Sequence, residues 1–133
     1  MIAPWAEKYL EVPWDGSGTA GSFSGCNCYG LLRLIFREEF GIILPMYEGE
    51  AYSRGVDKEA LGKKFERGRQ QWTEIKVPTV GDVAWLRIAG HPFHVGVMVS
   101  PEHFIHIEEG CGPVVESIKS PRWARRIHGF ARW

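Results

Sequence analysis

The chain has 133 residues, of which 44% are hydrophobic and 24% are charged. These fractions are ordinary for a soluble globular protein, and the length suits a single domain over residues 1–133 that encloses a real core. Sixteen basic and sixteen acidic residues cancel, so we expect no overall field that attracts nucleic acid or anionic lipid. No apolar run approaches the roughly 20 residues that cross a bilayer, which excludes membrane insertion.

The first ten residues, MIAPWAEKYL, lack the charged start and long apolar stretch of a secretory signal. We therefore expect synthesis in the cytoplasm without a signal peptide. Residues 3–10 suit a short helix with Pro4 near its start, and the glycine-rich run 12–25 suits an irregular loop. Three cysteines are an odd number and do not indicate a disulfide framework, so at least one thiol should stay unpaired.

Residues 25–41 are typical of a helix that begins with a thiol. One face carries apolar residues at the i, i+3, i+4, i+7 spacing, namely Cys28, Leu31, Leu32 and Ile35, and Phe36 and Phe40 widen it. Asn27 is a suitable N-cap, and Gly41 suits the left-handed residue that ends a helix. Cys28 then lies in the first turn, where unpaired N–H groups and the helix dipole favour a thiolate. Gly30 costs a helix roughly 1 kcal/mol relative to Ala, which indicates that another part of the chain approaches it closely.

The rest of the chain predicts one further helix and a meandering sheet. The helix covers residues 57–68, and the strand patterns cover residues 72–77, 83–88, 93–100, 103–107, 114–117 and 127–133. Turn chemistry separates the later strands. Helices that come first and an antiparallel sheet that follows give an α+β fold, with the Cys28 helix against the sheet.

A thiol nucleophile needs a base, and the base works better when a third group orients it. Among five histidines we favour His94, because its strand is otherwise apolar and a core histidine there would carry a desolvation cost. Gly96, on the same face, leaves room for another backbone or a ligand. His106 lies in the middle of the next strand. A short turn at Pro101 makes the two strands antiparallel neighbours, so one imidazole can act as base and the other can orient it.

Other interpretations of these residues stay open at this point. A histidine in a strand is often a core or surface residue whose hydrogen bonds are satisfied and which has no catalytic role. Cys26-x-Cys28 together with His94 and His106 also makes a Cys2His2 zinc set, but one intervening residue is fewer than the usual two to four, so we predict no metal and no cofactor. Cys26 competes as nucleophile, yet it falls outside the helix if Asn27 is the cap.

Two features near the C-terminal end carry less information. Cys111, in a Gly-Cys-Gly-Pro turn, is expected to be a bystander. The Trp and Arg residues of positions 122–126 suit a glycan or partner surface, but we favour a solvated face.

Three short motifs resemble the signature of the NlpC/P60 family of cysteine peptidases. They are Asn27-Cys28-Tyr29-Gly30-Leu31, His94-Val95-Gly96-Val97 and Phe104-Ile105-His106-Ile107. The two histidines are twelve positions apart, as in the family, and Pro78-Thr79-Val80-Gly81-Asp82-Val83 is similar to the turn before the family's central strand. The phage-type branch, found in tail-tip assembly proteins and gene-transfer-agent peptidases, is similar over residues 4–10, 12–16, 33–45 and 126–133.

The resemblance implies a papain-like α+β fold, with N-terminal helices packed on a central antiparallel sheet. It implies Cys28 as nucleophile, His94 as general base and His106 as the orienting third residue, without a metal. Trp14 takes the place of a family tyrosine that lines the substrate site, and Asn27 stands where the family commonly has Asp. The implied activity is hydrolysis of peptidoglycan stem peptides, beside γ-linked D-glutamate, by a phage-tail-associated protein at the host cell wall. The alternative is a tail assembly protein with weak or lost hydrolysis, whose partners are other tail proteins.

Overall fold

The computed structural model describes residues 1–46 and 58–133. Along the chain the elements are η1 (a 3-10 helix, Pro4–Tyr9), α1 (Cys28–Phe40), α2 (Lys58–Arg69), β1 (Thr73–Ile75), β2 (Val83–Ile88), β3 (His91–Met98), β4 (His103–His106), β5 (Val114–Ser117) and β6 (Ile127–Arg132). Asp57, the predicted start of the second helix, lies outside the described residues. None of the described helices is long and apolar enough to cross a membrane.

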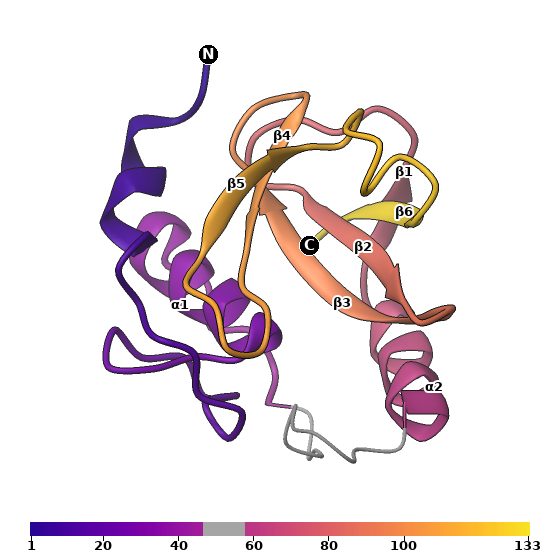
Figure 1. The fold of residues 1–133 in the computed structure, drawn as a ribbon, viewed down its shortest axis with the longest axis horizontal. Coiled ribbons are helices and arrows are strands. Elements are labelled where there is room, and N and C mark those ends of the chain that lie inside the picture. Colours follow the sequence, from indigo (N-terminus) through magenta and orange to yellow (C-terminus); the bar gives the residue numbers. More distant parts are fainter. Residues whose placement is uncertain (47–57) are drawn as a thin grey trace.

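Six antiparallel strands form one sheet in the order β1-β6-β2-β3-β4-β5 (Figure 1). Strands β2 to β5 follow the sequence as a meander, and β6 inserts between β1 and β2. Both helices contact β3, which lies in the interior of the sheet. The predicted α+β, papain-like arrangement of helices on an antiparallel sheet is therefore confirmed.

Helix α1 begins and ends where the sequence predicts. The Asn27 side chain accepts a hydrogen bond from the Gly30 N–H, and Gly41 ends the helix in the left-handed conformation with φ 66°. The predicted close approach of another segment to Gly30 is confirmed. A Cβ atom built on Gly30 would lie 1.8 Å from the carbonyl oxygen of Gly18. The loop before α1 is therefore held against its first turn.

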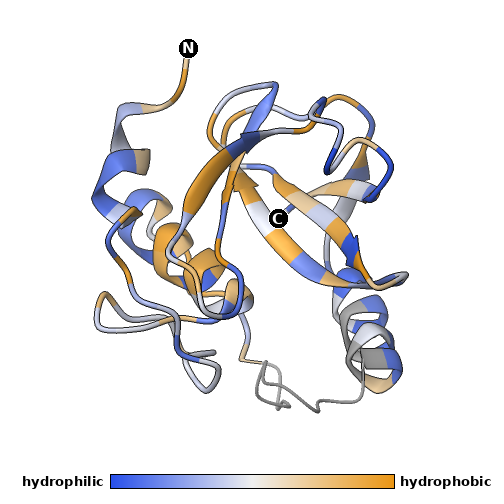
Figure 2. Ribbon diagram, in the orientation of Figure 1, coloured by the Kyte–Doolittle hydropathy of each residue, from blue (hydrophilic) through white to orange (hydrophobic). Residues whose placement is uncertain are grey.

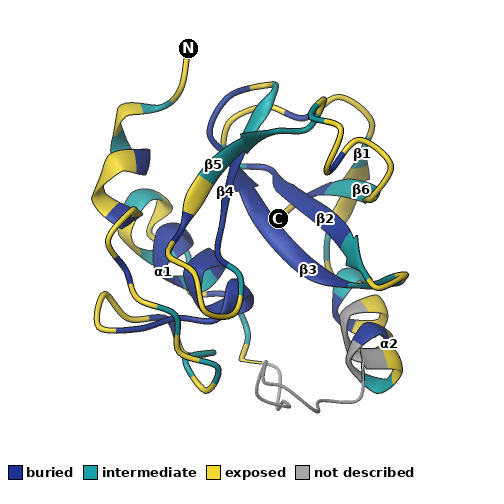
Figure 3. Ribbon diagram, in the orientation of Figure 1, coloured by how far each residue is buried: buried dark blue, intermediate teal, exposed yellow. Residues whose placement is uncertain are grey.

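Alternation along β3 and β4 divides the sheet into two apolar faces. Phe93, Val95 and Val97 belong to the same apolar cluster as the buried residues of α1. Figure 2 shows hydrophobic residues in both elements. Met98 and Phe104 belong to a second cluster on the other face. Most of β2, β3 and β4 is therefore buried, whereas the last two residues of β2 and the first two of β3 are half-buried (Figure 3).

The turn at 78–82 is tied to the far end of the chain through one buried carboxylate. Asp82 accepts a hydrogen bond from the Thr79 N–H at 2.8 Å, and the Arg132 guanidinium donates to both of its carboxylate oxygens at 2.8 and 2.9 Å. This contact fixes the start of β2 against the end of β6. It gives Asp82 of this motif a structural role.

Candidate active site

Cys28 is the first residue of α1, with its sulfur beside the backbone of β3. Its Sγ lies 3.8 Å from the carbonyl oxygen of Phe93, the residue before His94. The described pairing between β3 and β4 covers Val97 and Met98, so the thiol contacts the part of β3 that precedes this pairing. Cys28 is 2% exposed, so little of this residue faces solvent.

The loop that leads to Cys28 is held in place by the amide of Asn27. While its oxygen caps α1, its Nδ2 donates to the Gly16 carbonyl at 3.2 Å and to the Thr19 hydroxyl at 2.6 Å. A carboxylate has no donor for the Gly16 carbonyl, which accounts for Asn rather than Asp at this position. Trp14 forms an isolated β-bridge with Cys26, which is two residues before Cys28 in the sequence. The backbone of Trp14 therefore lies beside the segment that leads to the thiol, and its side chain is half-buried.

His94 and His106 meet as the sequence predicts. Nε2 of His94 and Nδ1 of His106 are 2.8 Å apart, and both residues are buried. The register that pairs Val97 with Ile105 places His106 opposite Gly96, diagonal to His94 on the same face. A Cβ on Gly96 would lie 2.7 Å from the Phe104 ring and 2.9 Å from the Ile105 carbonyl, so this glycine makes room for β4.

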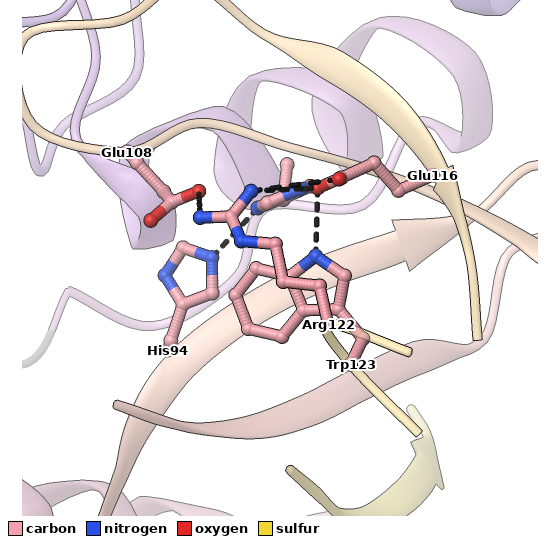
Figure 4. A network of polar contacts seen from close by, with 6 residues as sticks. His94, Glu108, Glu116, Arg122 and Trp123 are labelled. Atoms are coloured by element: carbon pink, nitrogen blue, oxygen red, sulfur yellow. Dashed lines mark hydrogen bonds and ion pairs between the residues drawn. The ribbon is translucent and has the colours of Figure 1, made fainter. Parts of the chain in front are cut away.

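A carboxylate that sequence reasoning missed completes this line of side chains. Glu116 on β5 pairs with Phe104 and is therefore diagonal to His106, whose Nε2 contacts Glu116 Oε2. The indole N–H of Trp123 donates to the same oxygen at 2.7 Å, and the Arg122 guanidinium contacts both carboxylate oxygens at 3.4 Å (Figure 4). The strand pattern of residues 114–117 contained Glu116, but only the register between β4 and β5 shows that this residue lies beside His106.

The expectation of a solvated face at positions 122–126 is wrong for Trp123, which is 0% exposed. Its ring is stacked on His94, with centroids 5.7 Å apart and an angle of 14° between the rings, and packs against Phe104 in the second apolar cluster. The guanidinium of Arg122 lies 4.7 Å above the indole. Burial of this large apolar ring explains why the segment folds back over the imidazole pair.

Burial sets the charge state of the two imidazoles. Desolvation lowers the pKa of His94 well below its usual value, and the nearby His106 and Arg122 add to this effect. Desolvation also lowers the pKa of His106, although the hydrogen bond that His106 donates to Glu116 works in the opposite direction. Burial would raise the pKa of Glu116, but hydrogen bonds from His106 and Trp123 outweigh it and lower that pKa. At neutral pH the resting group is therefore two neutral imidazoles and one carboxylate.

The Cys2His2 zinc interpretation fails on geometry. Cys26 Sγ donates to the Ser22 carbonyl at 3.0 Å, and burial raises the pKa of its thiol. The facing nitrogens of His94 and His106 already bond each other. Among the described residues the metal-type donors that converge are those of His106, Glu108 and Glu116, within 4.8 Å, and there the Arg122 guanidinium binds both carboxylates.

None of the three cysteines is in a disulfide. Cys111 is exposed in its turn, outside the group of residues described above.

Comparisons with known proteins point to one family. Residues 11–132 match the NlpC/P60 family. The murein DD-endopeptidase MepS/murein LD-carboxypeptidase of Escherichia coli K12 is 26% identical over 108 residues, which are 81% of this chain and 50% of that protein. A probable endopeptidase, an NlpC homologue of Haemophilus influenzae, is 30% identical over 76% of this chain and 45% of its own length. The chain therefore spans about half the length of these curated relatives.

Solved structures agree on the fold. An NLP/P60-family protein from Staphylococcus aureus, described as similar to lipoprotein, superposes with a TM-score of 0.64 at 21% identity, over 96% of this chain and 38% of that one. The NlpC/P60 domain of the peptidoglycan hydrolase SagA gives 0.59 at 20% identity, over 96% of this chain and 92% of that one. The matched residues include the Cys28 segment and both histidine strands. This chain belongs to the NlpC/P60 family.

Proposed function

We propose that this chain hydrolyses peptide bonds of bacterial peptidoglycan, with Cys28 as nucleophile, His94 as general base and His106 as the group that orients His94. One observation carries the proposal. The Cys28 thiol contacts the carbonyl of Phe93, and the next residue, His94, is hydrogen-bonded to the buried imidazole of His106. Family membership supports it, because the relative at 26% identity is named as a murein endopeptidase and the one at 30% as a probable endopeptidase.

The proposed reaction uses only side chains and backbone of this chain. The Cys28 thiol gives its proton to His94, and the sulfur attacks the carbonyl carbon of the substrate amide. The oxyanion that forms is held partly by the Cys28 backbone N–H at the start of α1, where the helix dipole favours negative charge. His94 then gives the proton to the leaving amine, the C–N bond breaks, and a thioester remains.

Water completes the cycle. His94 takes a proton from the attacking water, the thioester carbon–sulfur bond breaks, and the thiolate is reprotonated as the acid product leaves. We propose that Trp14 forms part of the substrate-binding wall, because its backbone is bridged to Cys26 beside the nucleophile segment. No step requires a metal.

The bond we propose is the one beside γ-linked D-glutamate in stem peptides, in a protein associated with a phage tail. Support comes from the likeness of residues 4–10, 12–16, 33–45 and 126–133 to phage-type members. MepS is named as a DD-endopeptidase and LD-carboxypeptidase, so a D,D or L,D bond is the competing specificity. The masses of the digestion products distinguish these bonds.

A digest of defined muropeptides, analysed by mass spectrometry, tests the proposal. We expect the parent protein to cleave them, Cys28→Ala to abolish cleavage, and the matched control Cys26→Ser to retain it, because the Cys26 sulfur bonds the main chain of Ser22. Equal loss in both variants, or an inactive parent, would contradict the assignment.

A tail assembly role with weak or lost hydrolysis is the second candidate. The observation that favours it is the burial of Cys28, which is 2% exposed. Alkylation separates the two candidates. An activated Cys28 reacts with iodoacetamide well below pH 8, whereas an inert buried thiol does not.

A further inference from the structure

The line of polar side chains across β3, β4 and β5 does not end at the two histidines. His94, His106 and Glu116 lie on adjacent strands, on one face of the sheet, each diagonal to the next. Figure 4 shows the carboxylate of Glu116 held from several sides, with Trp123 below it and Arg122 reaching between it and Glu108. This inference rests on the proposed function and deepens it.

The positions of the protons follow from the partners. Glu116 is an acceptor only, because its hydrogen bonds keep it ionised, so Nε2 of His106 must carry the proton that joins them. A neutral His106 then has no proton on Nδ1. That nitrogen must accept from Nε2 of His94, 2.8 Å away. Nδ1 of His94 is therefore left without a proton.

We propose that Glu116 is a positioning residue that fixes the tautomers of both imidazoles, so that Nδ1 of His94 is the nitrogen that accepts the Cys28 proton. When the proton moves from sulfur to this nitrogen, a thiolate and an imidazolium form and no other bond changes. Glu116 then balances the positive charge through His106. Without that carboxylate the imidazolium forms less readily, since both rings are buried.

The residues around Glu116 hold its carboxylate in place beside His106. Its Oε2 accepts from His106 and from Trp123, whose buried indole is stacked on His94, so one aromatic ring touches both ends of the relay. The charged groups that face the imidazole pair are Glu108, Glu116 and Arg122. Arg122, half exposed, binds both carboxylates and covers Glu116 on its outer side.

Glu108 provides a matched control. It binds the same guanidinium as Glu116, but it has no hydrogen bond to either imidazole. Glu116→Gln keeps one oxygen that can accept from His106 and Trp123, but it removes the negative charge and replaces the other oxygen with an NH2 group. Glu108→Gln removes one charge from the same cluster but leaves the hydrogen bonds between Glu116, His106 and His94 in place.

The first test needs no substrate. In protein labelled with ¹⁵N-histidine at pH 7, long-range ¹H–¹⁵N spectra should show His94 and His106 both neutral and both protonated on Nε2. A proton on Nδ1 of His106, or a cationic ring at this pH, would overturn the proposal. This result does not depend on hydrolysis, so it separates failure of the relay from failure of the proposed function.

The second test follows alkylation of Cys28 by iodoacetamide against pH, with peptide mapping to exclude Cys26 and Cys111. We expect Glu116→Gln to slow Cys28 modification at pH 7 by about 10- to 100-fold, the range found for carboxylates that orient metal-binding histidines, and to leave the rate above pH 9 unchanged. Glu108→Gln should change the pH 7 rate by less than about threefold, since Glu108 makes no hydrogen bond to either ring. Equal effects of the two variants, or a profile for Glu116→Gln that matches the parent, would overturn the role of Glu116.

Discussion

Replacement of Gly30 by Ala tests how α1 is seated behind the proposed nucleophile. Gly30 is the third residue of α1, and the Gly18 carbonyl of the preceding loop lies directly over it. The added methyl carbon would be 1.8 Å from that oxygen and 3.2 Å from Oδ1 of Asn27. A backbone carbonyl cannot rotate aside like a flexible side chain, so the loop itself has to move.

Three effects set the size of the change. Overpacking at a tight site costs about 1–3 kcal/mol of unfolding free energy. The Gly18 carbonyl also accepts from the N–H groups of Gly21 and Asn27, and loss of these two bonds costs about 1 kcal/mol each. Better helix propensity returns about 1 kcal/mol. The expected net loss is about 2–4 kcal/mol, or a fall of roughly 8–16 °C in Tm for a chain of this size.

Urea and thermal unfolding, followed by circular dichroism, measure this effect. Gly62→Ala in α2 is the matched control, because its methyl group would meet nothing closer than Pro92 Cδ at 3.4 Å. That substitution should stabilise the fold by about 0.5–1 kcal/mol through helix propensity alone. A Gly30→Ala protein as stable as the parent would refute the described packing of the loop on α1.

Two further substitutions follow from the same structure. Asn27→Asp removes the donor to the Gly16 carbonyl and places a carboxylate in a buried site, and we expect a loss of about 1–3 kcal/mol in urea unfolding; an unchanged stability would contradict the role of the amide. His94 and His106 have lowered pKa values in the folded state, so the unfolded chain binds more protons below pH 6.5. Stability should therefore be fully present above that pH and fall as the pH drops from about 7 to 5, by up to about 1.4 kcal/mol per pH unit for each ring. His94→Gln should flatten this slope, and an equal slope in both proteins would argue against a buried neutral His94.

Local signals were strong enough to predict α1 and the histidine pair. The cap at Asn27, the end at Gly41 and the need for a glycine at position 30 each follow from the chemistry of a single turn, and the structure confirms all three. His94 and His106 were predictable as a pair because a short turn joins their strands, so that alternation alone places them on one face.

Contacts between elements that are distant in sequence could not be predicted from local patterns. Glu116 became part of the group only through the β4–β5 register, which depends on how the turn at 110–113 closes. General exposure statistics placed Trp123 and its neighbouring arginines on a solvated face. Its indole instead fills the apolar cluster on the far face of the sheet. The burial of Cys28 likewise depends on packing between elements distant in sequence, which no local pattern reports.

The proposed mechanism depends on coupling between the Cys28 sulfur and the imidazole of His94. The pH profile of Cys28 alkylation in the parent and in His94→Gln measures that coupling directly. We predict a reactive thiolate well below pH 8 in the parent, and in the variant a single onset near pH 8.5, the ordinary value for a cysteine. Superimposable profiles would show that His94 does not act on Cys28, and the proposed chemistry would have to be abandoned.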